Sequence, residues 1–147
     1  MERPENPEID RILTPSAPSP AGHYSQATAW SDLLFVSGQL PVRPDGGDTV
    51  DRPFDEQAAQ ALANLQEILI AAGSGFDRVL KVTAYIVGVD HWPAFNRMYA
   101  ELFGDARPAR SVVPVPALHH GYLVEIDAIA LAGGAVATRK GNDHGAV

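Results

Sequence analysis

The segment 122–131 is the part of the chain that most constrains its fold. It reads YLVEIDAIAL and places apolar side chains at both odd and even positions, whereas a strand with one face in water alternates apolar and polar residues. Both faces of this strand must therefore be covered. Glu125 lies inside the run, and because an ionised carboxylate buried without a partner is costly, we expect a cation or water beside it.

Two other segments have the periodicity of helices. Residues 55–72 place apolar side chains on one stripe at spacings of three and four: Ala58, Leu62, Leu65, Leu69 and Ala72. The amide side chains, among them Gln57 and Asn64, fall mostly off this stripe. A Gly-Ser-Gly sequence follows and suits the end of a helix. Residues 92–103 form the second predicted helix, with Pro93 tolerated in its first turn.

The remaining apolar runs predict strands around these helices. An edge strand lies near Ile12, a hairpin turns at Ser31 before the run 33–37, and further strands span 79–89 and 110–115. The order βββαβαββ indicates an α+β fold, with a single mixed sheet of about six strands and two helices on one face. Since two helices cover only one face, we expect the other face to pack against another copy of the chain.

Length and charge bound the function. The 147 residues are the length of one domain, which we divide into an extended N-terminal arm at 1–14, a domain at 15–131 and a flexible C-terminal tail at 132–147. The net charge of −7 argues against a nucleic-acid partner. No stretch approaches the about 18 consecutive apolar residues of a membrane span. We therefore expect a cytoplasmic protein without a nucleic-acid or membrane partner.

Arg110 has two interpretations from residue spacing. If 110–115 pairs with 122–131, the guanidinium of Arg110 faces the region of Glu125. It then forms either a structural ion pair with Glu125 or Asp127, which is the more frequent arrangement, or a fork for a substrate carboxylate. The spacing alone does not decide between them.

Other polar residues end predicted strands or lie in loops. Tyr24 begins one strand and Ser37-Gly38 ends the next, where a strand end can face a cleft, although singly they are typical of a core-edge aromatic and a bend. His119 and His120 are adjacent, but neighbours in an extended chain point to opposite sides and no further ligand pattern accompanies them. This favours a solvated loop over a metal site. Without phosphate-binding or nucleophile motifs, we expect no cofactor.

Four segments taken together resemble a known family. They read GHYSQA at 22–27, LFVSGQLP at 34–41, RPARS at 107–111 and VEIDAIA at 124–130. In order and spacing they are similar to the signatures of the RidA/YjgF (Rid) family of enamine/imine deaminases, over about residues 15–131. The resemblance implies a chorismate-mutase-like fold and a homotrimer with clefts between its subunits. It also implies cofactor-independent hydrolysis of 2-imino or 2-enamino acids, such as 2-aminoacrylate, to 2-oxo acids and ammonia.

The resemblance implies a role for individual residues as well. Arg110 matches the arginine that binds the substrate carboxylate, and Glu125 matches the acid that positions or activates the attacking water. Tyr24 matches a catalytic tyrosine that lines the pocket. The positions implied to bind substrate are Ser37, Gly38, Asn96 and Val112.

Three features depart from the family pattern and bear on the substrate. His23 stands where many members have proline, and Val112 stands where many have a cysteine whose backbone carbonyl faces the imine. The loop 116–122 is bulkier than usual, which alters what the pocket admits. The alternative to a deaminase is a non-catalytic trimer that binds small carboxylates or serves a pathway as an accessory protein. An endoribonuclease is disfavoured by the negative charge.

Overall fold

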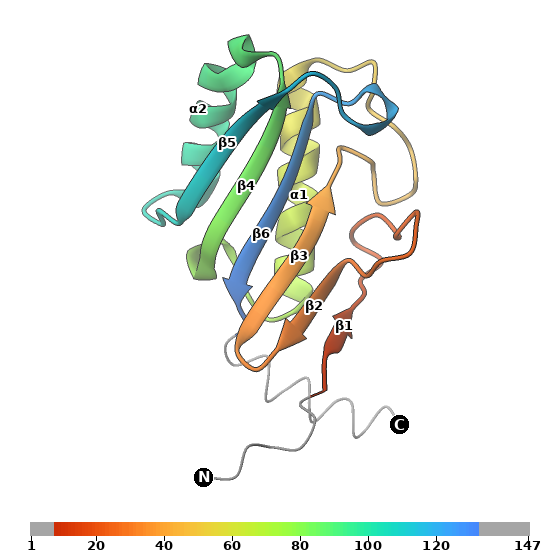
Figure 1. Ribbon diagram of the computed structural model, residues 1–147, viewed down its shortest axis with the longest axis vertical. Coiled ribbons are helices and arrows are strands. Elements are labelled where there is room, and N and C mark those ends of the chain that lie inside the picture. Colours follow the sequence, from red (N-terminus) through yellow and green to blue (C-terminus); the bar gives the residue numbers. More distant parts are fainter. Residues whose placement is uncertain (1–7, 133–147) are drawn as a thin grey trace.

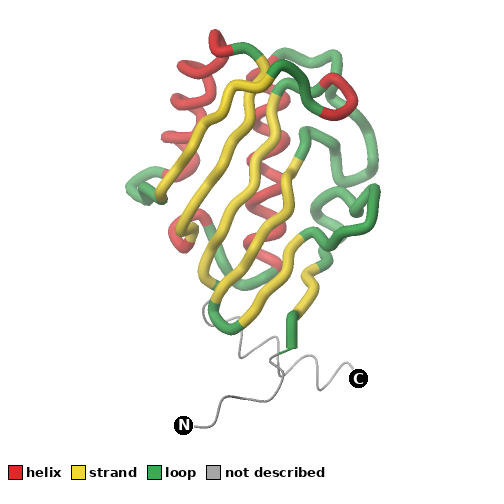
Figure 2. Tube along the Cα trace, in the orientation of Figure 1, coloured by secondary structure: helices red, strands yellow, loops and turns green. Residues whose placement is uncertain are grey.

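The computed structural model describes residues 8–132, which form one mixed six-stranded sheet with two α-helices on one face (Figures 1 and 2). The strands are β1 (Asp10–Ile12), β2 (Ala27–Trp30), β3 (Leu33–Gln39), β4 (Val79–Val87), β5 (Ala109–Val115) and β6 (Val124–Leu131). The helices are α1 (Phe54–Ala71) and α2 (Trp92–Phe103), with short 3₁₀ turns η1 (Phe76–Arg78), η2 (Val89–His91) and η3 (His119–Gly121). The predicted fold class and element order are confirmed.

The sheet has the strand order β1-β2-β3-β6-β4-β5. All neighbours are antiparallel except β4 and β5, which run parallel because α2 carries the chain back across the sheet between them (Figure 1). β6 then enters antiparallel between β3 and β4. The predicted pairing of 110–115 with 122–131 is therefore wrong, since β4 separates β5 from β6.

Helix α1 packs its apolar stripe against the middle of the sheet. Its large aliphatic side chains are buried: Leu62, Leu65, Ile68 and Leu69. The helix ends where Gly73 takes a φ of +70° and Ser74 N–H donates to the carbonyl of Leu69 at 2.8 Å, which satisfies a free carbonyl of the last turn. The predicted bounds of both helices agree with the structure to within one residue.

The two faces of the sheet differ because side chains alternate along each strand. On β6, Val124 and Ile126 point to the helix-covered face and are fully buried. Ile129 points to the opposite face, which neither helix covers (Figure 1), and stays half-buried. Its neighbour on β3, Phe35, is 43% exposed. We call this second surface the open face; that another copy of the chain packs there stays a prediction.

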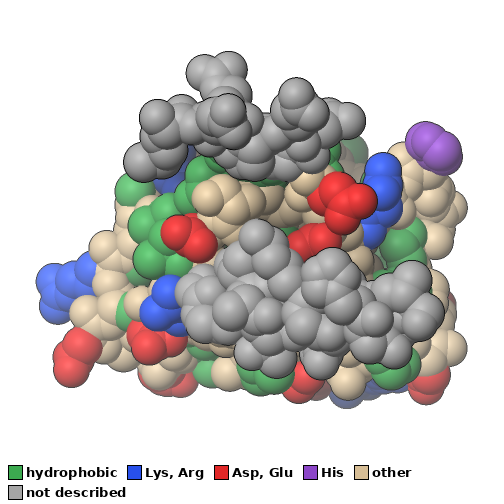
Figure 3. Space-filling view, turned by 90° about the horizontal axis from the view of Figure 1, so that it is seen from below, with side chains coloured by type: hydrophobic (Ala, Val, Ile, Leu, Met, Phe, Trp, Pro, Cys, Tyr) green, Lys and Arg blue, Asp and Glu red, His purple; other side chains and the backbone are tan. Residues whose placement is uncertain are grey.

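The ends of the chain are described in part. Strand β1 lies inside the predicted arm 1–14 and adds an edge to the sheet. Residues 1–7 and nearly all of the predicted tail 132–147 lie outside the described residues. Within 8–132, no helix is long and apolar enough to cross a membrane. Seen from the lower end of Figure 1, the described surface mixes acidic, basic and apolar side chains (Figure 3).

Candidate active site

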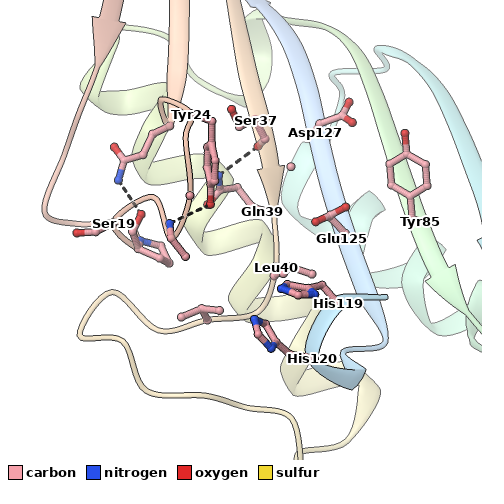
Figure 4. A pocket seen from close by; sticks show the side chains of 16 residues that line it. Ser19, Tyr24, Ser37, Gln39, Leu40, Tyr85, His119, His120, Glu125 and Asp127 are labelled. Atoms are coloured by element: carbon pink, nitrogen blue, oxygen red, sulfur yellow. Dashed lines mark hydrogen bonds between the residues drawn. The ribbon is translucent and has the colours of Figure 1, made fainter. Parts of the chain in front are cut away.

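A crevice of about 610 Å³ opens beside the carboxyl end of β3 (Figure 4). Its walls come from the loop 18–24, the end of β3, the turn η3, and the open-face side chains of β4 and β6. Four of the predicted site residues line it together: Tyr24, Ser37, Gly38 and Glu125. Segments far apart in the sequence thus meet at one end of the sheet.

A β-bulge in β3 shapes the floor of this crevice. Val36 pairs with Ala128 and Gln39 with Ile126, so β3 has one residue more than β6 over this interval. The extra length places Ser37 and Gly38 beside Glu125. A Cβ on Gly38 would lie 3.0 Å from Glu125 Cδ, closer than ordinary packing allows. Glycine at 38 therefore makes room for the Glu125 carboxyl.

Hydrogen bonds hold the bulge in place. Ser37 Oγ donates to the carbonyl of Ser25 at 2.6 Å, which links β3 to the segment before β2. The buried Gln39 side chain donates from Nε2 to the carbonyl of Ser37 at 3.1 Å. With its hydrogen committed to Ser25, the Ser37 hydroxyl has only lone pairs left for a ligand, so it acts as an acceptor.

The two carboxyl groups of the crevice hold protons more tightly than ordinary carboxyl groups. Burial raises the pKa of Glu125, and the nearby Asp127 charge raises this pKa further, while His119 opposes both effects. Burial also raises the pKa of Asp127, against the influence of Lys81. A carboxyl group whose pKa is moved toward neutrality can both accept and return a proton, as hydrolysis requires.

The outer wall of the crevice is a loop held by a buried glutamine. Gln26 Oε1 accepts from Thr14 N–H at 2.7 Å, and Gln26 Nε2 donates to the carbonyls of Thr14 and Pro18 at 3.0 and 2.9 Å. Tyr24, at the end of this loop, is exposed, and its hydroxyl accepts from Ala21 N–H at 3.3 Å. Gln26 was part of a recognised segment, but sequence reasoning assigned it no role.

Buried amides of α1 hold the opposite wall. Asn64 Nδ2 donates to the carbonyls of Leu40 and Val42 at 3.1 and 2.7 Å, and both of those residues line the crevice. Gln57 Oε1 accepts from Leu123 N–H at 2.9 Å, two residues before Glu125. Both amides were predicted to lie off the buried stripe, yet both are buried. Both side chains are buried because backbone carbonyls of loops near the core need hydrogen-bond donors.

The other predicted site residues lie away from the crevice. Arg110 pairs with Val82 of β4, so its side chain is on the helix-covered face, and its guanidinium carbon lies 4.7 Å from the centre of the Tyr99 ring of α2. Asn96 is exposed, three residues before Tyr99 on that helix, and Val112 follows Arg110 on the same side of β5. We call Asn96, Tyr99, Arg110 and Val112 the β5–α2 edge.

Arg110 and Glu125 therefore occupy opposite faces of the sheet within one copy. Within one copy, therefore, the conditional prediction that Arg110 faces the region of Glu125 is wrong, and so is the alternative of a structural ion pair with Glu125 or Asp127 of the same copy. The strand order places β4 between β5 and β6, and the register sets the faces: Arg110 pairs with Val82 and Glu125 with Tyr85, and these two β4 residues point to opposite sides.

His119 and His120 both line the crevice from η3. They are exposed, as a solvated loop requires, but they do not point to opposite sides. Because the chain turns here, with φ of +61° at His120, the two rings lie 3.7 Å apart between centroids. Among residues 8–132, no group of three or more His, Asp or Glu side chains is placed to hold a metal ion.

Comparison with known proteins finds relatives that match nearly all of the described residues. The family model described as Endoribonuclease L-PSP matches residues 14–132. A RutC family protein of Pyrococcus horikoshii is 42% identical over 119 residues, which are 81% of this chain and 94% of that protein. A protein of Capra hircus named 2-iminobutanoate/2-iminopropanoate deaminase is 41% identical over 122 residues, or 83% and 89% of the two chains.

Solved structures share the fold. A member of the conserved Rid protein family from Yersinia pestis superposes with a TM-score of 0.81 at 40% identity, covering 84% of this chain and 99% of that one. E. coli TdcF with bound serine superposes with a TM-score of 0.79 at 32% identity, covering 83% and 98%. A chain that matches the family model over residues 14–132 and folds as solved family members do belongs to the Rid family, also called YjgF/RidA or Endoribonuclease L-PSP.

Proposed function

We propose that the protein hydrolyses reactive 2-imino or 2-enamino acids, such as 2-aminoacrylate, to 2-oxo acids and ammonia. The observation that carries the proposal is Glu125, a half-buried carboxyl group with a raised pKa that lies against Gly38 in an open crevice. Relatives about 40% identical to this chain are named 2-iminobutanoate/2-iminopropanoate deaminases, which supports the reaction class.

The reaction requires few catalytic groups from the protein. A protonated imine carbon is already electrophilic, so catalysis needs a held carboxylate, an oriented water and a proton acceptor. The Glu125 carboxylate takes a proton as water adds to the carbon, and the amine then leaves as ammonia while a carbonyl forms. Tyr24 and Ser37 line the same crevice and orient the substrate and the water. None of these steps requires a metal or an organic cofactor.

The substrate carboxylate calls for a guanidinium or ammonium group as its partner. Among residues 8–132 of one copy, the side chains that line the crevice include no lysine or arginine. Arg110, whose guanidinium forms two parallel bonds to a carboxylate, lies at the β5–α2 edge of the same chain. We propose that a neighbouring copy lays this edge on the open face and thereby delivers Arg110, Asn96 and Val112 to the crevice.

A closed ring of three copies satisfies this geometry. Each copy gives its β5–α2 edge to one neighbour and receives the edge of the other, so every crevice is completed in the same way. The half-exposed apolar side chains of the open face, Phe35 and Ile129 among them, are then buried. A homotrimer also explains why β6 is apolar on both faces.

A second candidate is binding without turnover. It is favoured by E. coli TdcF, whose structure contains bound serine, an amino acid with a free carboxylate. The same crevice and the same Arg110 would hold a small carboxylate ligand in this chain. A tight complex with a 2-oxo acid and no ammonia release from imines would support this candidate over the deaminase. The net charge of −7 opposes RNA cleavage.

Mixed assemblies test the proposed function. We expect Arg110→Ala and Glu125→Gln each to lose about 10²-fold or more of kcat/KM for ammonia release from 2-aminoacrylate generated in the assay. When the two variants are co-expressed, about one quarter of the sites in randomly mixed trimers combine an intact Glu125 with an intact Arg110 of a neighbour. Recovery of activity to that extent supports a shared site. An Arg110→Ala protein with the wild-type rate contradicts the mechanism.

A further inference from the structure

We propose that His119 is a further catalytic residue, a second acid–base group that works with Glu125 during hydrolysis. This inference rests on the proposed function and deepens it. The deaminase chemistry described above uses Glu125 alone for every proton transfer. The crevice offers a second titratable group, in the histidine pair to which the sequence assigned no catalytic role.

The position of His119 is set by a tight turn. η3 closes with Gly121 N–H donating to the carbonyl of Leu118 at 3.1 Å, and φ is positive at both His120 and Gly121. Tyr122, directly after the turn, is buried and anchors it to the domain. The imidazole of His119 therefore projects from a supported turn into the crevice, on the side of Glu125 and Leu40 (Figure 4).

His119 and Glu125 also interact through their charges. The His119 charge lowers the pKa of Glu125, against the effects of burial and Asp127. The titratable side chains that line the crevice come from every wall: Tyr24, Tyr85, His119, His120, Glu125 and Asp127. Lys81 acts on Asp127 from the same face of the sheet. An imidazole has two ring nitrogens and can donate a proton from one form and accept a proton in the other, as general acid–base catalysis requires.

The proton transfers balance with His119 in this role. Water adds to the iminium carbon, the C–O bond forms, and Glu125 takes one water proton while the C=N electron pair moves to nitrogen. The imidazolium of His119 then protonates the amine, and the C–N bond breaks with its electron pair leaving on ammonia. The oxygen lone pair forms the carbonyl, and neutral His119 takes the remaining hydroxyl proton. Glu125 finally yields its proton to the departing ammonia, which leaves as ammonium.

The test compares the kinetics of variants at two neighbouring histidines. His119→Gln keeps a polar side chain of similar size but cannot titrate, and His120→Gln makes the same change one residue later in the same turn. We expect His119→Gln to lower kcat about 10²-fold with KM changed less than threefold, and to remove one limb of the pH profile of kcat while the limb that depends on Glu125 remains. His120→Gln changes a side chain of the crevice wall, so it should act on KM more than on kcat and should keep both limbs of the pH profile. Free imidazole should partly restore the activity of His119→Ala, because the crevice is open to solvent.

The outcomes separate this inference from the proposed function. A wild-type rate and pH profile in His119→Gln, or equal losses in both variants without imidazole rescue, overturns the role of His119 and leaves the deaminase intact. A wild-type chain that releases no ammonia overturns both. NMR titration of the Glu125 carboxyl carbon needs no activity: we expect its midpoint to rise in His119→Gln and not in His120→Gln. An unchanged midpoint in both variants contradicts the pairing itself.

Discussion

The two faces of the central strand β6 have different roles. On the helix-covered face, Val124, Ile126, Ala128 and Ala130 are at most 2% exposed and pack beneath α1. On the open face, Glu125 and Asp127 are half-buried, and burial disfavours their charged forms. Because successive side chains alternate, stability and chemistry occupy alternate residues of a single strand. One face can therefore change its chemistry without loss of the core on the other.

The largest contrast should come from two isoleucines of β6. Ile126→Ala removes a fully buried side chain from the covered face and should lower the free energy of unfolding by about 2–5 kcal/mol. Measured on separated copies, Ile129→Ala, the same change three residues later on the open face, should cost less than about half as much, because within one copy that side chain is only half-buried. Denaturant unfolding of both variants measures the difference, and equal losses would contradict the division between the faces.

The open face should instead govern assembly. Phe35→Asp places a charge in the exposed apolar surface beside Ile129, and we expect the proposed trimer to dissociate to single copies at micromolar concentration. Ile70→Asp is the control, since Ile70 is also exposed but lies on α1, away from the sheet. Sedimentation velocity measures the assembly state of both variants. A Phe35→Asp protein that remains trimeric means that the copies meet elsewhere.

A single methyl group should disturb the crevice. Gly38→Ala adds a Cβ 3.0 Å from Glu125 Cδ, so the carboxyl must move, and we expect kcat to fall about tenfold or more with little change in stability. Gly22→Ala also lies at the crevice wall, but its Cβ would meet the Tyr24 ring at an ordinary 3.5 Å. If steady-state kinetics show equal losses in both variants, crowding of Glu125 is not the cause.

The pH dependence of stability should follow the open-face carboxyl groups. Burial raises the pKa of Glu125 above its ordinary value of 4.5 and that of Asp127 above 3.8. Above these ordinary values the unfolded chain loses protons that the folded chain still holds, so stability falls as the pH rises through the raised pKa values. Glu125→Gln and Asp127→Asn should therefore raise the melting temperature at pH 7 and 8 and change it little below pH 3.8. Equal effects at all pH values would contradict this origin.

Local features of the fold were predictable from the sequence, but neighbours in space were not. The helices at 54–71 and 92–103 follow from periodicity and end signals, which lie within the segments themselves. The order of strands depends on contacts between distant segments. The insertion of β6 between β3 and β4 cannot be predicted from the spacing of residues along the chain. The predicted contact of Arg110 with Glu125 within one copy failed for this reason.

The site was predictable as a set of residues and not as an arrangement. The recognised segments named Tyr24, Ser37, Gly38 and Glu125, which share one crevice. Supporting groups such as Asn64 were missed, because a polar side chain in an amphipathic helix usually indicates a solvated position. Asn64 is buried because its amide donates hydrogen bonds to the backbone carbonyls of Leu40 and Val42, in a loop earlier in the chain. No local sequence pattern indicates a hydrogen bond between such distant segments.

The smallest effect should come from the Tyr99 hydroxyl at the β5–α2 edge. Burial raises the pKa of Tyr99 to about 12, with Arg110 opposing the shift, and within residues 8–132 its buried oxygen has no hydrogen-bond partner. Tyr99→Phe keeps the ring under the Arg110 guanidinium and removes an unpaired polar atom, so we expect the free energy of unfolding to rise by up to about 1 kcal/mol with kcat/KM unchanged.

Tyr99→Leu removes the ring as well, and the lost cation–π contact, of about 0.5–2 kcal/mol, should raise KM for the carboxylate substrate more than it lowers kcat. A loss of stability in Tyr99→Phe would contradict the expected rise in the free energy of unfolding and would mean that the hydroxyl has a hydrogen-bond partner beyond residues 8–132 of its own copy.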